Sequence, residues 1–188
     1  MAKKLKNRKE NQKIVILKNS IFQKSKNLVE RGIDMLYISY GSNMNIEQMK
    51  HRCPHTKIVG NGKLHGWKLV FNYHADIIHT GNEEDFVPVV VWNLTNKIDK
   101  ENLDRYEGYP LYYKRITIPV TMDCSGEVKK AMVYVMTDER KGIYPPDVYY
   151  FNVIEDGYRA NGIDITPLYD AAKHSIDNIT EYNQYNSR

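Results

Sequence analysis

The residue types best suited to chemistry in this chain include Gly41-Ser42-Asn43, a small polar segment between two contrasting runs. Residues 35–40 are β-branched and aromatic, as in a strand, whereas residues 45–50 are helix formers with apolar residues at helical spacing. A turn between a strand and a helix directs several backbone N–H groups the same way, and the helix dipole adds positive potential. The sequence therefore predicts a turn that can bind a carboxylate or a developing oxyanion.

Glu107 is the strongest candidate for proton transfer, because it lies at the predicted end of a helix and precedes Gly108. An aromatic setting disfavours an ionised carboxyl and raises its pKa toward neutrality, where the group can both accept and donate protons. The alternative interpretation is a helix-end glutamate whose carboxyl is satisfied by backbone groups or tyrosine hydroxyls. The aromatic setting consists of Tyr106, Tyr109, Tyr112 and Tyr113.

Other candidate sites are weaker. His51 and His55 have a metal-binding spacing, but no acidic or cysteine ligand follows at a recognisable offset, so no metal site is predicted. Ser42 lacks the second glycine of a nucleophile elbow, which favours a hydrogen-bonding turn serine. Cys53 and Cys124 match neither a disulfide framework nor a CxxC motif, and both are expected to be reduced thiols.

Length and composition predict one domain of ordinary size. The 188 residues are enough to bury a core without disulfides or a structural metal. The longest apolar runs fall well short of the roughly 20 residues that a membrane helix needs. The start of the sequence lacks the apolar core of a secretory signal. We therefore expect a soluble cytoplasmic protein that does not bind a membrane.

Positive charge is concentrated in residues 1–31, which hold ten Lys or Arg and two Glu, a net charge of +8 against −4 for residues 32–188. A basic segment can bind nucleic acid or an acidic protein through non-specific electrostatics, although a solvated extension is the simpler interpretation. Apolar residues at helical spacing predict an amphipathic helix over residues 12–31 that packs on the domain or on a second subunit in a homodimer. These apolar residues are Ile14, Leu17, Ile21 and Leu28.

The remaining elements follow from periodicity and turn residues. Strands are predicted over residues 57–60 and 63–72, joined by a Gly60-Asn61-Gly62 hairpin turn, then a loop over residues 74–85 and a strand over 86–95. Next come a helix at 98–106, strands at 113–122 and 127–137 joined by a hairpin loop, a helix from Pro145-Pro146 to Gly162, and a last short helix after Pro167. This order predicts an α+β fold with a small mixed, mostly antiparallel β-barrel and a few short helices, because hairpin-sized turns exclude a doubly wound parallel sheet.

Three motifs occur in a fixed order: YISYGSNM at residues 37–44, LDRYEG at residues 103–108 and PPDVYY at residues 145–150. The chain thereby resembles the γ-glutamylcyclotransferase family and its AIG2-like relatives, from about residue 36 to about residue 172. The resemblance implies a small α+β barrel with a cavity at one end. It sets the predicted domain at residues 32–176, between a basic N-terminal extension at 1–31 and a C-terminal tail at 177–188.

The resemblance also implies residue roles. Glu107 becomes the proton acceptor, and Tyr113 and Tyr150 become cavity tyrosines, with Tyr112 left open as the alternative to Tyr113. The implied substrate-binding turn consists of Tyr37, Ile38, Ser39, Tyr40, Gly41, Ser42 and Asn43.

The implied reaction is the cyclisation of a γ-glutamyl amine or peptide to 5-oxoproline with release of the amine, and it needs no cofactor. The substrate's α-amino group must lose a proton before it attacks, and the leaving amine must gain one, so a single carboxyl can serve both steps. The sequence does not choose among γ-glutamyl substrates. The second hypothesis is a catalytically weak cavity-binding domain that residues 1–31 recruit to nucleic acid or an acidic partner.

Overall fold

The computed structural model describes residues 35–142 and 144–186, with side chains described as far as residue 180. The basic segment at residues 1–31, with its predicted helix and partners, lies outside the described residues, so those interpretations stay predictions. Among the helices of the described part, none combines the length and the apolar character needed to cross a membrane.

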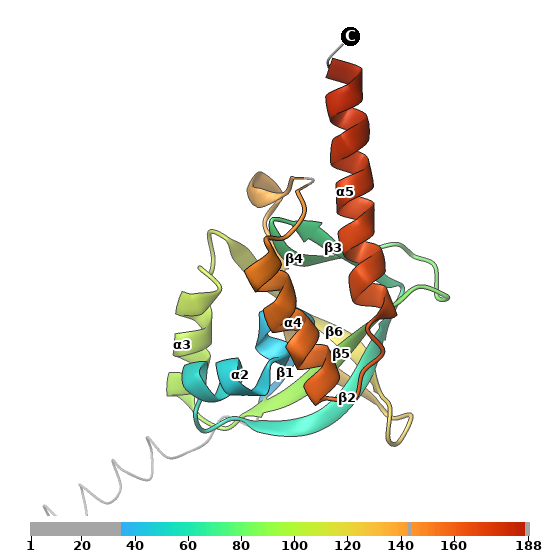
Figure 1. Ribbon diagram of the computed structural model, residues 1–188. Coiled ribbons are helices and arrows are strands. Elements are labelled where there is room, and N and C mark those ends of the chain that lie inside the picture. The colour runs from blue at the N-terminus through green and yellow to red at the C-terminus, as the bar shows by residue number, and fades with distance from the viewer. Residues whose placement is uncertain (1–34, 143, 187–188) are drawn as a thin grey trace, which may run out of the picture. The chain divides into compact units, whose positions relative to one another are not determined.

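A closed five-stranded barrel forms the centre of the described fold (Figure 1). Neighbouring strands are antiparallel except for β1 and β7, whose parallel pairing at Tyr37–Met132 and Ile38–Val133 closes the barrel. The α+β, mostly antiparallel barrel predicted from the sequence is thereby confirmed. In order around the barrel, the strands are β1 (Met35–Ser39), β5 (Phe86–Leu94), β2 (Lys57–His65), β6 (Tyr113–Met122) and β7 (Val128–Met136).

The strand sequences explain this core. Strand β5 is almost continuously apolar and is buried from Val87 to Trp92, because it pairs with β1 on one side and with β2 on the other. Strands β6 and β7 form the predicted hairpin, in register from Tyr113–Met136 to Thr121–Val128. Two long antiparallel ladders thus hold the segments that carry several of the cavity residues.

The predicted hairpin turn at residues 60–62 is wrong. Strand β2 runs through this segment, which contains a register shift between Ile58 and Gly60 against β5. At Gly62 the strand also begins to pair with β6, opposite Met122. Gly60 therefore marks a bulge, and Gly62 marks a crowded position where β2 pairs with β6. Both are common uses of glycine in a sheet.

The predicted loop at residues 74–85 is also wrong in its first half. Strand β4 (His74–His79) pairs with β3 (Trp67–Asn72) in a separate two-stranded sheet. The tight connection is Tyr73, which has a φ of 66°, a conformation in which tyrosine is uncommon. Its ring stacks on Tyr144 at 4.1 Å and its N–H donates to the Tyr144 carbonyl, so contacts distant in sequence support the turn.

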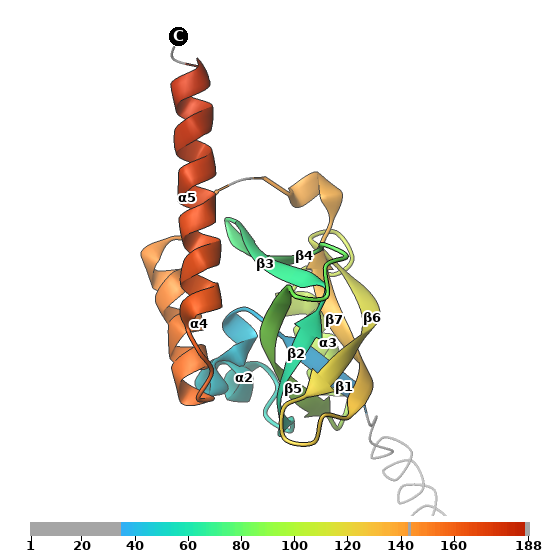
Figure 2. The same cartoon turned by 90° about the vertical axis from the view of Figure 1, so that its right-hand side faces the viewer.

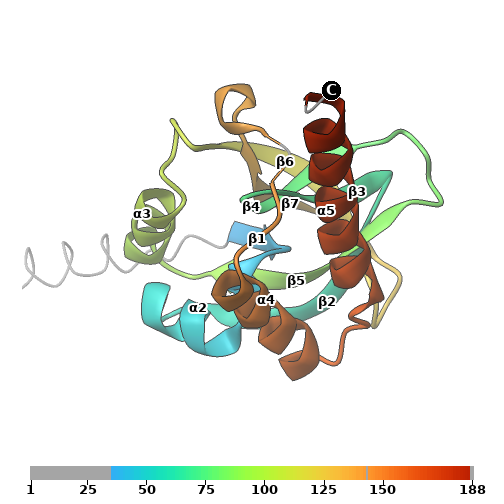
Figure 3. The ribbon, with the colours of Figure 1, turned by 45° about the horizontal axis from the view of Figure 1, so that its top comes forward.

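The helices lie beside the barrel and the β3–β4 sheet (Figures 2 and 3). Helix α2 packs beside α3, α4 packs against the short helix η1, and α5 packs against β3. In chain order the helices are η1 (Ser42–Met44), α2 (Ile46–Arg52), α3 (Lys97–Tyr106), η2 (Asp138–Arg140), α4 (Val148–Ala160) and α5 (Thr166–Asn186).

Helix α5 is longer than the short helix predicted. It continues through residues that the sequence analysis assigned to a tail from residue 177. Leu168, Ala171 and Ser175 are buried at helical spacing and form the face that packs on β3. Packing of the first part of α5 stabilises the start of the helix. The polar sequence that follows does not by itself predict that the helix continues.

Candidate active site

A cavity of about 290 Å³ lies where β1, β4, β6, β7, α3 and α4 converge. Its wall brings together residues from both ends of the described chain. The lining residues are Tyr37, Tyr40, Gly41, Ser42, Asn43, His74, Ala75, Tyr106, Glu107, Gly108, Tyr112, Tyr113, Tyr134 and Tyr150.

The turn after β1 forms one wall of the cavity. The first hydrogen bond of η1 runs from Met44 N–H to the Gly41 carbonyl at 2.9 Å, so the preceding N–H groups of Ser42 and Asn43 are not used within this helix. A Cβ at Gly41 would lie 3.1 Å from the Cβ of Ala75 and 3.5 Å from the Tyr150 hydroxyl. Glycine therefore allows the turn to approach β4 and α4 closely.

Glu107 is positioned by the way α3 ends. It is the C-cap residue, and Gly108 follows with a φ of 63°. Gly108 N–H donates to Arg105 and Tyr109 N–H donates to Asp104, the paired bonds of a Schellman motif, which requires a left-handed residue at Gly108. The Glu-Gly step predicted as a helix stop is thus the device that turns the chain immediately after the carboxyl.

The turn and Glu107 meet directly, although 64 residues separate them. Asn43 Nδ2 donates to Glu107 Oε1 at 2.6 Å and to the Tyr37 hydroxyl at 2.7 Å. The side-chain Oδ1 of Asn43 in turn accepts a hydrogen bond from the Arg52 guanidinium. The Glu107 carboxyl and the Gly41 turn therefore line the same cavity.

The Glu107 carboxyl has an unusual proton affinity. Burial raises its pKa to about 7, and the Arg52 charge and the Asn43 hydrogen bond oppose that rise. A carboxyl that titrates near neutral pH can exchange protons in both directions under ordinary conditions. Glu107 is therefore the candidate for a general acid and base at this site.

The cavity tyrosines differ in how their hydroxyl groups are used. Tyr113 donates to the Ala75 carbonyl at 2.9 Å, whereas Tyr150 accepts from Ala75 N–H at 3.2 Å. In the described residues, no acceptor is found for the hydroxyl hydrogen of Tyr150 or Tyr37. Both Tyr112 and Tyr113 line the cavity, with Tyr113 buried and Tyr112 more exposed.

Two residues of the predicted binding turn lie outside the cavity lining. Ser39 is buried, donates to the Val90 carbonyl and accepts from the Trp92 indole, while Ile38 is fully buried in the core. Their side chains are thereby committed to the barrel. The other five residues from Tyr37 to Asn43 line the cavity.

The sequence analysis missed several residues at or next to the site. Arg52, at the end of α2, holds Asn43, while His74 and Ala75 come from the segment predicted as a loop. Tyr134 lines the cavity from β7 and donates to Asp104 at 2.6 Å. In the sequence, Arg52 is only an arginine at the end of the helix that follows the turn. Its position along the chain does not reveal that it contacts Asn43.

The weaker candidate sites also have places in the structure. His55 Nδ1 lies 3.1 Å from Asp99 Oδ1, and Cys53 is buried with its thiol directed at the Asp99 carbonyl. In residues 35–142 and 144–186, no cluster of three or more His, Cys, Asp or Glu side chains could hold a metal ion.

The fold and this cavity define a class, a small α+β barrel with a cavity where a carboxyl is hydrogen-bonded to a Gly-Ser-Asn turn. The family described as "Gamma-glutamyl cyclotransferase, AIG2-like" matches residues 37–152, which is more than half of the chain. The chain belongs to this family. A comparison with curated protein sequences found no match.

Solved structures agree with this assignment. A structure titled gamma-glutamyl cyclotransferase is 26% identical, with a TM-score of 0.64 over 74% of this chain and 86% of that one. An uncharacterized protein from Homo sapiens is 27% identical, with a TM-score of 0.64 over 73% of this chain and 86% of that one. YkqA from Bacillus subtilis is 20% identical, with a TM-score of 0.60 over 84% and 58% of the two chains, and supports the fold alone.

Proposed function

We propose that the protein is a cyclotransferase that converts a γ-glutamyl amine or peptide to 5-oxoproline and releases the amine. The observation that carries the proposal is the Glu107 carboxyl, which has a pKa of about 7 and faces a cavity beside the Gly41 turn. Family membership and the 26% identical cyclotransferase structure support the same reaction.

The reaction needs one proton carrier. Glu107 takes a proton from the substrate's α-ammonium group, and the free amine attacks the γ-carbonyl carbon to form the ring C–N bond. In the tetrahedral intermediate, Glu107 gives this proton to the leaving nitrogen and takes the second proton from the ring nitrogen. The original amide C–N bond then breaks, and Glu107 passes the second proton to the released amine, which leaves as an ammonium. Both protons lost by the α-ammonium group thus reach the leaving nitrogen, and the carboxylate is restored.

The turn and the tyrosines supply binding groups in this proposal. The N–H groups of Ser42 and Asn43 can donate to the substrate carboxylate or to the tetrahedral oxyanion, as donors at such sites stabilise developing negative charge. The hydroxyl hydrogens of Tyr37 and Tyr150 can donate to the same substrate. Tyr113 instead shapes the wall, because its hydrogen is already bonded to Ala75.

The direct test is to incubate the full chain with γ-glutamyl dipeptides and γ-glutamyl amines and to quantify 5-oxoproline. We expect 5-oxoproline and free amine in equal amounts from at least one substrate, formed at least about 100-fold more slowly by the Glu107→Gln variant. Absence of 5-oxoproline from every substrate, with a folded protein, would contradict the proposed function. If 5-oxoproline forms, the substrate with the highest kcat/KM identifies which amine the enzyme releases.

A further inference from the structure

Arg52 does not line the cavity, yet its guanidinium contacts three residues that do. Its Nη1 donates to the side-chain Oδ1 of Asn43 and also to Ser42 Oγ, the latter at 3.2 Å. The guanidinium carbon lies 3.5 Å from the centre of the Tyr106 ring. Its other terminal nitrogen donates to Gln48 Oε1 at 2.7 Å, so the fork is held on two sides and one face.

These contacts determine which way the Asn43 amide points. Arginine carries only donors, so it must face the oxygen of the amide. The amide nitrogen is then directed to Glu107 and Tyr37, and its two hydrogens match its two acceptors. Without Arg52, a half-turn of the amide would direct its oxygen at the Glu107 carboxylate, and two acceptors would face each other.

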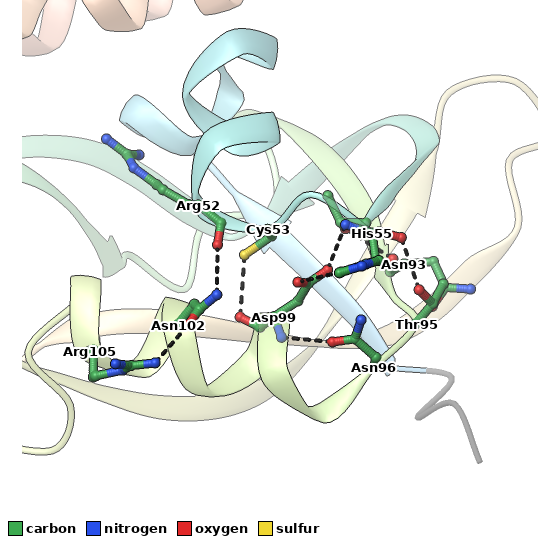
Figure 4. A network of polar contacts seen from close by, with 10 residues as sticks. Arg52, Cys53, His55, Asn93, Thr95, Asn96, Asp99, Asn102 and Arg105 are labelled. Carbon is green, nitrogen blue, oxygen red and sulfur yellow. Dashed lines mark hydrogen bonds and ion pairs between the residues drawn. The ribbon is translucent and has the colours of Figure 1, made fainter. Parts of the chain in front are cut away.

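The element that carries Arg52 is itself tied to α3, the helix that ends at Glu107. Figure 4 shows Asn102 donating to the Arg52 carbonyl at 3.2 Å and the Cys53 thiol donating to the Asp99 carbonyl at 3.3 Å. Asp99 also accepts from His55 N–H at 3.0 Å. Arg52 and Glu107 therefore belong to one hydrogen-bonded unit of two helices.

We propose that Arg52 is a positioning residue for the cyclisation, which holds the Asn43 amide in the one orientation that donates to the Glu107 carboxylate. The effect on the reaction rests on the proposed function, whereas the effect on the carboxyl itself does not. Arg52 orients the donor to the carboxylate through Asn43, while its positive charge acts on Glu107 directly, and it touches no reacting atom.

The electrostatics of the site agree with this geometry. Six titratable groups that interact with Glu107 are buried or half-buried, and their raised pKa values keep them neutral: Tyr37, Tyr40, Cys53, Tyr113, Tyr134 and Tyr150. His74 from β4 lines the same cavity. Among the influences on Glu107, the positive charge of Arg52 is the largest that lowers its pKa. Loss of Arg52 should therefore raise that pKa above about 7.

The first experiment compares Arg52→Met with Arg105→Met. Arg105 is an exposed arginine on α3 whose partners among the described residues are the Glu101 carbonyl and Asn102, so it controls for the loss of a nearby charge. For Arg52→Met we expect kcat to fall about 10- to 100-fold with little change in KM, since a hydrogen bond to a charged group is lost. The acidic limb of the pH–rate profile should move to higher pH, and Arg105→Met should resemble the wild type.

A double-mutant cycle separates action through Asn43 from a general effect. If Arg52 acts through Asn43, Arg52→Met should cost little more in the Asn43→Ala background than Asn43→Ala alone. Fully additive losses, or a wild-type pH profile in Arg52→Met, would overturn the proposal. If Arg52→Met does not fold, Arg52→Lys preserves the charge but loses the planar fork. It should keep the acidic limb and lose kcat, and unchanged kcat would equally overturn the proposal.

A readout independent of turnover keeps the two proposals distinguishable. The Glu107 carboxyl carbon can be titrated by ¹³C NMR and assigned by its absence in Glu107→Gln. Its pKa should rise in Arg52→Met and stay unchanged in Arg105→Met. That result without any 5-oxoproline would contradict the proposed function alone, whereas 5-oxoproline with an unmoved Glu107 pKa would contradict the role of Arg52.

Discussion

Asp99 and Glu107 lie near opposite ends of helix α3, and their carboxyl groups differ in burial and in hydrogen-bond partners. Asp99, in the first turn, is fully buried, and its two oxygens face the backbone N–H and the ring of His55. Glu107, at the C-cap, faces the cavity, and within the described residues one hydrogen bond reaches its carboxyl, from Asn43.

The difference shows what separates a structural acid from a reactive one. Both side chains leave bulk water, but the protein replaces the lost hydration of Asp99 with two partners and leaves most of the Glu107 carboxyl facing an open cavity. Desolvation without full compensation raises the Glu107 pKa to about 7. The two residues share a carboxyl group and a helix but differ in their hydrogen-bond partners.

The largest expected effect is the loss of turnover in Glu107→Gln. The amide keeps an acceptor for Asn43 but cannot carry a proton, so kcat should fall about 10²- to 10⁴-fold while KM changes little. Steady-state kinetics together with a thermal melt measure this. Turnover close to the wild-type value would remove Glu107 from the chemistry and would erase its contrast with Asp99.

The second prediction concerns stability against pH. Because the folded-state pKa of Glu107 is raised from 4.5 to about 7, the folded protein binds this proton more tightly than the unfolded chain does. Stability from this group is therefore present at low pH and is lost as pH rises from about 4.5 to about 7, by at most about 3 kcal/mol.

Glu107→Gln should remove that penalty. Urea unfolding should show little difference between the variant and the wild type at pH 4.5 and a variant that is more stable at pH 8. A gap that stays constant with pH would show that the Glu107 pKa is not raised. Ionisation of Glu107 would then cost the folded protein no stability, and the contrast with Asp99 would be lost.

The third prediction is the converse at Asp99. Asp99→Ala leaves the His55 N–H without its acceptor, and the free energy of unfolding should fall by about 2 kcal/mol. The kcat of the folded fraction should fall far less than in Glu107→Gln. Asp177→Ala, which removes an exposed carboxyl paired with Lys173, provides the control and should leave both quantities unchanged. A larger kinetic than stability loss at Asp99 would break the comparison.

The smallest effects are expected at the two caps of α3. Asn96→Ala removes the side chain that accepts Asp99 N–H, and Gly108→Ala forces a left-handed alanine whose Cβ would lie 2.9 Å from that of Tyr112. Each should cost about 1 kcal/mol of stability. Only Gly108→Ala should also lower kcat, because only that end directs Glu107. Equal kinetic effects from the two caps would show that the helix end does not position the carboxyl.

Local signals predicted the elements that carry the site. The apolar run of β5, the turn between β6 and β7, and the Glu-Gly step that ends α3 all depend on residues close in sequence, and each was located to within a few residues. The β3–β4 hairpin was missed because Tyr73 offers no turn signal and is held in its conformation by Tyr144, 71 residues away. The glycines of β2 were assigned to a hairpin turn because glycine also occurs in bulges and at crowded positions of a sheet. The sequence alone does not distinguish these uses.

The sequence by itself determined which residue types can do the chemistry, the glutamate before a glycine and the Gly-Ser-Asn turn after a strand, because these depend on local backbone geometry. Only the tertiary structure decided that Asn43 donates to Glu107, that Arg52 orients Asn43, and that Ile38 and Ser39 turn away from the cavity. The physical reason is that a pKa and a hydrogen bond depend on neighbours in space, and closure of the barrel sets those neighbours across 64 residues of chain.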